Sequence, residues 1–160
     1  MRFWLGAAVI AIAAASGLGS AHAEKKRTPY FASISASEAR MRTGPGRNYP
    51  AIWLYRRAGL PVKVIEIYHE WRKVEDPDGS QGWMLANLLS DARTGYVLGD
   101  AAEMREAPSF NAKVLWRAAP GVVGRVSRCA RGWCWFDVRG RMGYVEANRI
   151  WGVAPEELIN

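Results

Sequence analysis

The sequence predicts an all-β protein built from two small β-barrels in tandem, preceded by an N-terminal signal peptide. Gly82–Asn87 and Gly143–Asn148 share one pattern (glycine, aromatic, apolar, variable, Ala, Asn) and lie 61 residues apart. A repeat with this period indicates two copies of one small module. Each copy has about five short β-favouring segments between Gly or Pro turns and no long helical period, which is typical of a small barrel. Modules of about 60 residues are near the lower limit for an independent core, and the chain's 8 tryptophans can supply large apolar side chains for it.

Residues 1–23 have the features of a signal peptide. A positively charged start precedes an almost wholly apolar stretch at 3–19, and Ala21-His22-Ala23 matches the small-x-small pattern of a cleavage site. The alternative is an uncleaved membrane anchor. The stretch is short for a crossing of roughly 20 residues, but the basic Lys25-Lys26-Arg27 that follows favours an anchor. We expect cleavage after Ala23 and an exported protein, periplasmic or secreted, with no stable membrane insertion after cleavage.

The chain is basic, with a formal net charge of +7. A basic exported protein has several anionic partners available to it, including cell-wall polymers, anionic lipids and lipopolysaccharide phosphates. Nucleic acid is the usual partner of a basic chain, but export argues against it here.

The first copy contains a series of extended segments, which we expect at 30–34, 39–42, 52–55, 62–68, 71–75 and 82–84. Thr43–Pro50 is dense in turn-forming residues and predicts a loop. Asp76–Gly79 predicts a turn, because Pro77 presets φ and Gly79 accepts a positive φ. Residues 86–89 suggest one helical turn.

The second copy repeats this order. Trp135–Val138 aligns with Trp71–Val74, which leaves seven residues before Gly82 but four before Gly143 and so predicts a shorter hairpin in the second copy. The boundaries that follow are a linker at 24–29, a first barrel at 30–92, a connecting segment at 93–98 that includes a possible shared strand, a second barrel at 99–154 and a tail at 155–160.

The inventory of reactive side chains argues against an enzyme. Cleavage would remove His22 and leave one histidine, His69, at a hairpin tip, whereas hydrolytic sites pair a base with a nucleophile and an orienting group. Asp76 and Asp78 belong to a turn, and a calcium loop would need several more oxygen ligands. We expect no catalytic residue, no metal and no cofactor.

Cys129 and Cys134 are the only cysteines, and an even count in an exported chain favours a disulfide. The four residues between them form a credible hairpin tip. A redox-active pair would usually be spaced Cys-x-x-Cys, and a zinc site would need two further ligands. We expect a structural disulfide that staples the tip of the hairpin.

These motifs together resemble the bacterial SH3-like (SH3b) family of exported proteins. Arg42-Thr43-Gly44-Pro45 matches the Arg-x-Gly-Pro loop of that family, and Trp71–Val74 and Gly82-Trp83-Met84 follow in the family's order. The second copy carries the cysteine pair and ends in Trp151-Gly152-Val153, as in the tandem form of the family. The resemblance covers roughly residues 30–153. It implies two SH3-like barrels and a role similar to that of cell-wall-targeting domains that bind peptidoglycan.

The resemblance also indicates where a ligand would bind, because loops in SH3-like barrels wall a groove in which aromatic faces stack on peptide or sugar. The ligand-binding candidates are Tyr49, Trp53, Tyr55 and Tyr68 in the first copy, with burial the default for Trp53, and the cations Arg42, Arg139 and Arg141. Arginine captures carboxylate or phosphate with two parallel hydrogen bonds. The alternative for Arg139 and Arg141, which share a strand face, is a solvated surface. Trp71, Trp83, Trp135 and Tyr144 are first of all core candidates.

Two functions follow as hypotheses. The first is a non-enzymatic exported binding protein that recognises peptidoglycan or its stem peptides. The second is a periplasmic adaptor that binds a peptide segment of a partner enzyme in the cell envelope.

Overall fold

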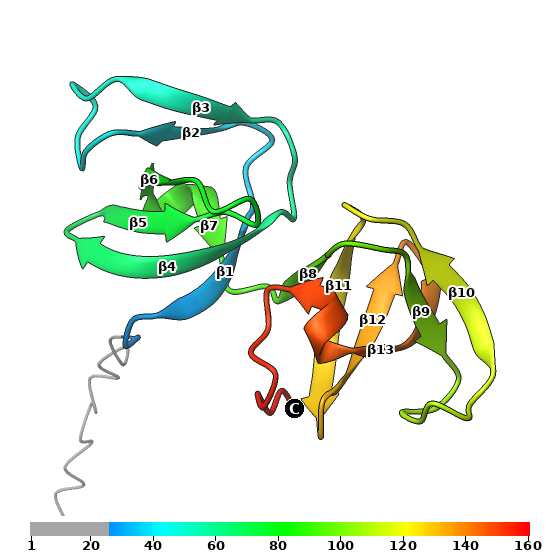
Figure 1. The fold of residues 1–160 in the computed structure, drawn as a ribbon. Coiled ribbons are helices and arrows are strands. Elements are labelled where there is room, and N and C mark those ends of the chain that lie inside the picture. The colour runs from blue at the N-terminus through cyan, green and yellow to red at the C-terminus, as the bar shows by residue number, and fades with distance from the viewer. Residues whose placement is uncertain (1–25) are drawn as a thin grey trace, which may run out of the picture.

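The computed structural model describes residues 26–160, so the predicted signal peptide at 1–23 lies outside the described residues. The described chain forms two seven-stranded antiparallel sheets (Figure 1). The first sheet contains β1 (Tyr30–Ile34), β2 (Ala39–Arg42), β3 (Ala51–Tyr55), β4 (Pro61–Tyr68), β5 (Trp71–Glu75), β6 (Gln81–Leu85) and β7 (Leu89–Ser90), with the 3-10 helix η1 (Ala86–Leu88) before β7. The second contains β8 (Thr94–Val97), β9 (Ala102–Arg105), β10 (Val114–Ala118), β11 (Val123–Ala130), β12 (Trp133–Val138), β13 (Arg141–Glu146) and β14 (Ile150–Trp151), with η2 (Ala147–Arg149) before β14.

The two sheets have the same strand order. The first runs β3-β2-β6-β5-β4-β1-β7, and the second runs β10-β9-β13-β12-β11-β8-β14. Each label in the second order is the corresponding label in the first plus seven, so the two halves of the chain repeat one fold. The predicted all-β class with two small barrels in tandem is confirmed.

Each barrel has its own core, which forms because alternate residues of each strand point inward. In the first barrel Val62 and Val64 of β4 are fully buried together with Met41, Val74 and Met84. In the second barrel the largest fully buried side chain is Phe136 of β12. The remaining members of the second core are Val97, Ala102, Met104, Ala118, Val126, Cys129, Cys134, Val145, Ala147, Ile150 and Val153.

The repeated Gly-aromatic motif lies where the sheet folds back on itself. β6 pairs with β5 along its length and with β2 at a single point, Arg42 opposite Trp83. A Cβ atom on Gly82 would lie 2.4 Å from Met41 Cγ and 2.8 Å from the Arg42 carbonyl oxygen. The same position in β13, Gly143, would place a Cβ 3.0 Å from Met104 Cβ. Glycine is therefore required because two strands cross at close range.

The alignment of the two copies by sequence was wrong by two residues. Gly82 lies opposite Val74, whereas Gly143 lies opposite Phe136 rather than Val138. The equivalent of Trp71 is therefore Trp133. The sequence did not distinguish the two choices, because a tryptophan followed three residues later by an apolar residue occurs at both 133 and 135. The hairpin tip is nonetheless shorter in the second copy, with residues 139–140 in place of 76–80.

Two segments expected outside the barrels form part of the second one. A strand is present in the connecting segment, but it is not shared: residues 94–97 form β8, which pairs with both β11 and β14 and so lies inside the second sheet. The tail is also held in place: Ile159 exchanges two backbone hydrogen bonds with Cys129, of 3.0 and 3.1 Å. Both segments are short, and their pairing depends on partners more than 20 residues away, which local sequence patterns do not reveal.

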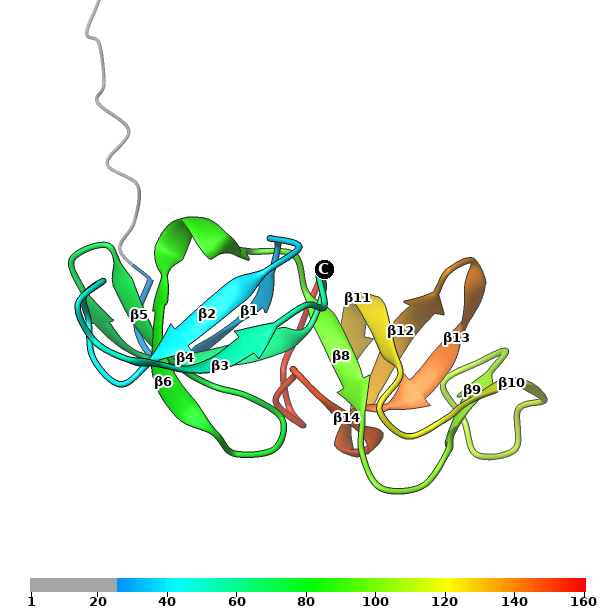
Figure 2. The ribbon, with the colours of Figure 1, turned by 90° about the horizontal axis from the view of Figure 1, so that it is seen from above.

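The two barrels contact each other directly. Tyr96 and Val123 of the second barrel pack against the core of the first, and Phe31 meets Trp151 edge to face at 5.2 Å between ring centroids. The Arg57 side chain donates a 2.7 Å hydrogen bond to the Gly121 carbonyl. Seen from above, the barrels lie side by side, with β8 on the side of the second barrel nearest the first (Figure 2).

Candidate functional site

A small open groove runs along the outer face of the first barrel, between β2 and the β6–η1 corner. We call it the first groove. Its cavity has a volume of about 250 Å³ and is lined by Glu38, Arg40, Arg42, Arg47, Trp71, Leu85, Asn87 and Leu88. Trp71 and Leu85 lie directly opposite each other on β5 and β6 and contribute apolar surface. Arg40 and Arg42 alternate with the buried Ala39 and Met41, so both face outward from β2.

Arg42 also braces the loop beside the groove. Its guanidinium donates a 2.7 Å hydrogen bond to the Tyr49 carbonyl at the far end of that loop. Arg105, the equivalent residue in the second copy, donates to the Ala112 carbonyl at the same distance. Because both copies use this contact, the arginine of the Arg-x-Gly-Pro motif has a structural role, in addition to lining the groove.

The first groove carries a net positive charge. Its one acidic residue is Glu38. The Glu38 carboxylate forms an ion pair with Arg56, which lies outside the groove, with 3.1 Å between Oε1 and Nε. None of the ion pairs within residues 26–160 involves Arg40, Arg42 or Arg47. Three guanidinium groups without an ion-pair partner among these residues therefore lie beside an apolar floor, with Glu38 as the one acidic residue of the lining.

The equivalent surface of the second barrel has lost these properties. Glu103 stands where the first barrel has Arg40, and it forms ion pairs with both Arg105 and Arg117. Phe110 stands in place of Arg47, and its ring packs at 5.1 Å against Trp133, the equivalent of the groove's Trp71. This surface is neutralised by carboxylate and covered by an aromatic ring, so of these two equivalent surfaces only that of the first copy is an open basic groove.

Tyr49 and Trp53 are exposed but do not line this groove. Tyr49 is 42% exposed, and its ring packs on the glycines of the loop: a Cβ on Gly44 would lie 2.4 Å from Tyr49 Cδ1. Trp53 is 57% exposed, contrary to the expectation of burial. The reason is that β3 is an edge strand, open on both faces. Its equivalent Trp116 is also exposed.

Tyr55 has a structural role instead of lining the groove. Its ring packs against the first core, and its hydroxyl donates a 2.7 Å hydrogen bond to Asp76 Oδ2. Burial and this bond to a carboxylate raise the pKa of Tyr55 well above its ordinary value. Asp76 in turn accepts the Asp78 and Ser80 backbone N–H groups, which confirms the turn predicted there.

The other predicted ligand residues line different cavities. Tyr68 is 52% exposed and lines a cavity of about 680 Å³ with Tyr30, His69 and Arg72. Arg139 and Arg141 line a cleft between the barrels, which we call the arginine cleft; its lining residues are Arg57, Val122, Val123, Val138, Arg139 and Arg141. The seven candidates therefore do not form one site.

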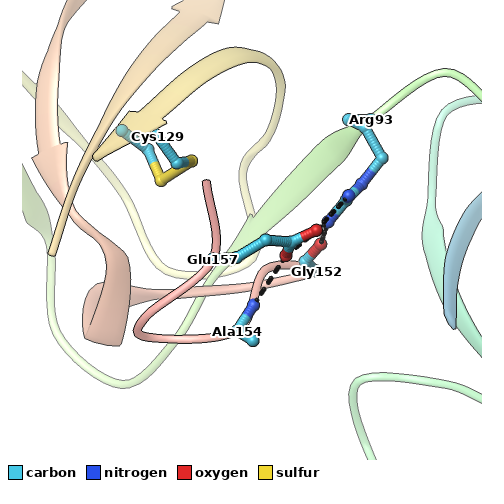
Figure 3. The surroundings of a disulfide bond; sticks show 6 residues. Arg93, Cys129, Gly152, Ala154 and Glu157 are labelled. Carbon is cyan, nitrogen blue, oxygen red and sulfur yellow. Dashed lines mark hydrogen bonds and ion pairs between the residues drawn. A yellow bond between two sulfur atoms is a disulfide. The ribbon is translucent and has the colours of Figure 1, made fainter. Parts of the chain in front are cut away.

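The predicted disulfide between Cys129 and Cys134 is confirmed (Figure 3). The two residues lie directly opposite each other on β11 and β12, with Cα atoms 4.1 Å apart. The backbone N–H and C=O of Cys129 bond to Ile159 on the other side, so this is a non-hydrogen-bonded pair, the closer type of cross-strand pair.

Reactive groups are sparse in the part of the chain that the structure describes. His69 is exposed in the turn between β4 and β5, with φ of 48°. Residues 26–160 contain no group of three or more His, Cys, Asp or Glu placed to hold a metal ion. Within the same residues, no helix is long and apolar enough to cross a membrane.

Two small barrels with identical topology, one of which carries an open groove, define a tandem module for binding. The bacterial SH3 domain model matches residues 35–91 and again 99–152. The chain belongs to the bacterial SH3 domain family. Domains of this family are non-catalytic binding modules, typically found in extracellular or cell-wall-associated proteins.

Arg40, Arg47, Trp71 and Leu85 were not among the predicted site residues. Two signals could have found them: buried and exposed residues alternate along β2, and Arg40 and Arg47 are substituted between the copies.

Several solved structures are similar to this chain. NlpC2 and NlpC1 from Trichomonas vaginalis are each 11% identical; they cover 79% and 78% of this chain and match it over 49% and 46% of their own length, each with a TM-score of 0.36. An NlpC/P60 family protein from Bacillus cereus ATCC 10987 is 14% identical over 76% of this chain and 55% of its own, with a TM-score of 0.35. This chain thus spans about half the length of these structures. No curated protein matches it.

Proposed function

We propose that this protein is a non-enzymatic exported binding protein whose first barrel holds the peptide stems of cell-wall peptidoglycan. In this proposal the arginines of the first groove pair with stem-peptide carboxylates, and Trp71 and Leu85 contact the aliphatic parts of the peptide. The predicted signal peptide supports export.

The observation that carries the proposal is the difference between the two copies. Arg40 and Arg47 are replaced by Glu103 and Phe110 at the same places on the same fold. Residues needed only for folding are expected to be alike in both copies, as Arg42 and Arg105 are. The basic groove is specific to the first copy, which supports a function for it, and guanidinium groups match carboxylates in geometry and charge.

Binding to purified sacculi tests the proposal. The chain without its signal peptide is incubated with sacculi, and the retained fraction is compared with that of an Arg40→Gln/Arg47→Gln variant. A matched control, Arg125→Gln/Arg131→Asn, removes the same charge from exposed positions of the second barrel. We expect the groove variant to lose retention and the control to keep it. Equal retention of all three, or none by the unmodified chain, would contradict the proposal.

A second candidate function is supported by the edge strand β3. Ile52, Trp53 and Leu54 are 44%, 57% and 39% exposed, and the outer edge of β3 is unpaired in the sheet. An unpaired edge with apolar side chains can accept a peptide as an added strand. Such a protein would be an adaptor for a periplasmic partner enzyme. Crosslinking in cells that captures one protein through Trp53, without sacculus binding, would favour this function over the first.

A further inference from the structure

The arginine cleft lies between the two barrels and is separate from the first groove. Its volume is about 490 Å³, and none of its lining residues is shared with that groove. Arg57 comes from the first barrel, in the loop after β3. In the second barrel Arg139 lies at the tip of the β12–β13 hairpin, and Arg141 is the first residue of β13. We propose that the arginine cleft is a binding site for a phosphate group, assembled only when the two barrels are docked.

Contacts within the protein hold two of the three arginines in position. Arg57 donates one of its N–H groups to the Gly121 carbonyl at 2.7 Å, which fixes its side chain across the barrel interface. The Arg141 guanidinium lies over the Trp116 ring, 5.3 Å from the centroid. Both contacts leave guanidinium N–H groups free to donate. A ligand therefore meets cations whose conformational freedom is already reduced.

The cleft has no protein anion to neutralise these cations. Its other lining residues are three valines, and no ion pair within residues 26–160 involves Arg57, Arg139 or Arg141. The carboxylate nearest along the chain is Asp137, which accepts the Gly140 backbone N–H at 2.7 Å and does not line the cleft. The charge of three arginines is thus left for a ligand.

The charge and the lining together favour phosphate. A single carboxylate would balance one of the three cations, whereas a phosphate monoester carries about −1.5 to −2 and three acceptor oxygens. Arginine binds phosphate through two parallel hydrogen bonds. Val122, Val123 and Val138 add apolar surface beside the cations, which suits a phosphate attached to an apolar group.

Titration with inorganic phosphate tests the site. Backbone amide signals of Gly121, Val123 and Gly140 are followed by NMR at constant ionic strength, with chloride replaced by phosphate. We expect saturable shifts at these three residues. Arg139→Asn should weaken binding about tenfold by removing a charge-assisted contact, and Arg57→Gln should do the same from the other barrel.

Arg131→Asn is the matched control. Arg131 and Arg139 are both exposed hairpin-tip residues with φ of 53°, and asparagine tolerates that conformation. Arg131 does not line the cleft, so its replacement should leave phosphate binding unchanged. Absence of saturable shifts in the unmodified chain, or equal weakening by Arg131→Asn and Arg139→Asn, would overturn the proposal.

A second arm distinguishes the source of the phosphate. Co-sedimentation is measured with vesicles of phosphatidylcholine, with and without phosphatidic acid. Binding that requires phosphatidic acid and Arg139 supports the site and assigns it to a lipid phosphate. Phosphate-dependent shifts without vesicle binding support the site and assign it to a soluble phosphate. If Arg131→Asn and Arg139→Asn reduce vesicle binding equally, the result counts against the proposed phosphate site.

Discussion

Arg93 and Glu157, 64 residues apart in sequence, form a two-point ion pair that fastens the C-terminal segment to the start of the second barrel. The two nitrogen–oxygen distances are 2.5 and 2.9 Å, and Arg93 also donates to the Gly152 carbonyl at 2.8 Å (Figure 3). Both side chains are about three-quarters buried. Glu157 in turn accepts the backbone N–H of Ala154, which closes the segment into a compact turn.

Glu157→Gln should lower the free energy of unfolding by about 1–3 kcal/mol, because it leaves a partly buried guanidinium without its anion. Hydrogen bonding from Arg93 lowers the pKa of Glu157 below its ordinary value of 4.5. The folded carboxyl therefore binds its proton less readily than the unfolded one, so the stabilisation is complete above pH 4.5 and is lost as the pH falls through the lowered folded value. Urea unfolding at neutral pH and at acid pH should show the variant and the parent converging under acid conditions. A difference independent of pH would contradict this assignment.

Tyr55→Phe should cost about 1 kcal/mol at neutral pH, because Asp76 Oδ2 loses its hydrogen-bond donor. The raised pKa of Tyr55 means that the unfolded chain loses this proton first as the pH rises past the ordinary value of 10.0. The contribution of this hydrogen bond to the free energy of unfolding is therefore present below pH 10 and declines above it. The free energy of unfolding of Tyr55→Phe should lack that part of the decline. Tyr49→Phe, which removes a hydroxyl from an exposed ring, should change stability by less than about 0.5 kcal/mol.

Replacing Cys129 and Cys134 together with alanine should lower the free energy of unfolding by about 2 kcal/mol, because the disulfide closes a loop with a sequence separation of only 5. Hydrogen exchange of the Ile159 backbone N–H, which donates to the Cys129 carbonyl, should be faster in the same variant. Thermal unfolding of the variant without reductant provides the measurement. A loss of the folded state would show that the disulfide holds the whole barrel and not the hairpin tip.

Gly82→Ala should destabilise the first barrel by about 1–3 kcal/mol, since the added methyl group would overlap the Arg42 carbonyl and Met41. Gly143→Ala is the matched comparison in the second copy. The Cβ at position 143 would lie 3.0 Å from Met104 Cβ, whereas the Cβ at position 82 would lie 2.4 Å from Met41 Cγ, so Gly143→Ala should destabilise less. Chemical unfolding of both variants gives the ranking, and the reverse order would be inconsistent with the crossing geometry described.

Arg40→Glu gives the first barrel the residue that the second barrel has at Glu103. The new carboxylate should pair with Arg42, as Glu103 pairs with Arg105, and neutralise the first groove. We expect unchanged stability, because the second barrel accommodates the same residue on the same strand, and at least about tenfold weaker sacculus binding. Glu103→Arg serves as the reciprocal variant. A stable Arg40→Glu protein that binds as the parent does would exclude the first groove as the binding site.

The fold was accessible from sequence because its signals are local or periodic. The Gly-aromatic repeat, the Asp76–Gly79 turn and the cysteine pair each follow from neighbouring residues, and all are found as expected. The docked tail depends on a distant partner and was missed. A strand was expected at 96–98, but its place inside the second sheet depends on pairing with β11 and β14 and was not foreseen. The alignment error at Trp133 has a different cause, since the pairing register is set by the partner strand and not by the pattern itself.

The candidate site was less accessible. Tyr55 has the composition of a ligand-binding residue, but its hydroxyl is occupied by Asp76, and a hydrogen bond across 21 residues leaves no trace in sequence. Trp53 was expected to be buried because tryptophan usually is, and only the sheet order reveals that β3 is an edge. Arg57 lines one cleft with Arg139 and Arg141 because the two barrels are docked, which no feature of either copy predicts.

One of the contacts between the barrels joins the same turn from each copy. The turn at 57–61 carries the hydrogen bonds Gly59 to Ile34 and Leu60 to Arg57, and the turn at 119–123 repeats them as Gly121 to Val97 and Val122 to Ala119. These two turns meet through Arg57 and Gly121. The contact is not reciprocal, because Ala119 stands in the second copy at the place of Arg57 and has no side-chain donor for the Gly59 carbonyl. The two copies therefore meet as unequal partners: the same turn supplies both sides of this contact, but the hydrogen bond across it comes from a side chain that only the first copy has.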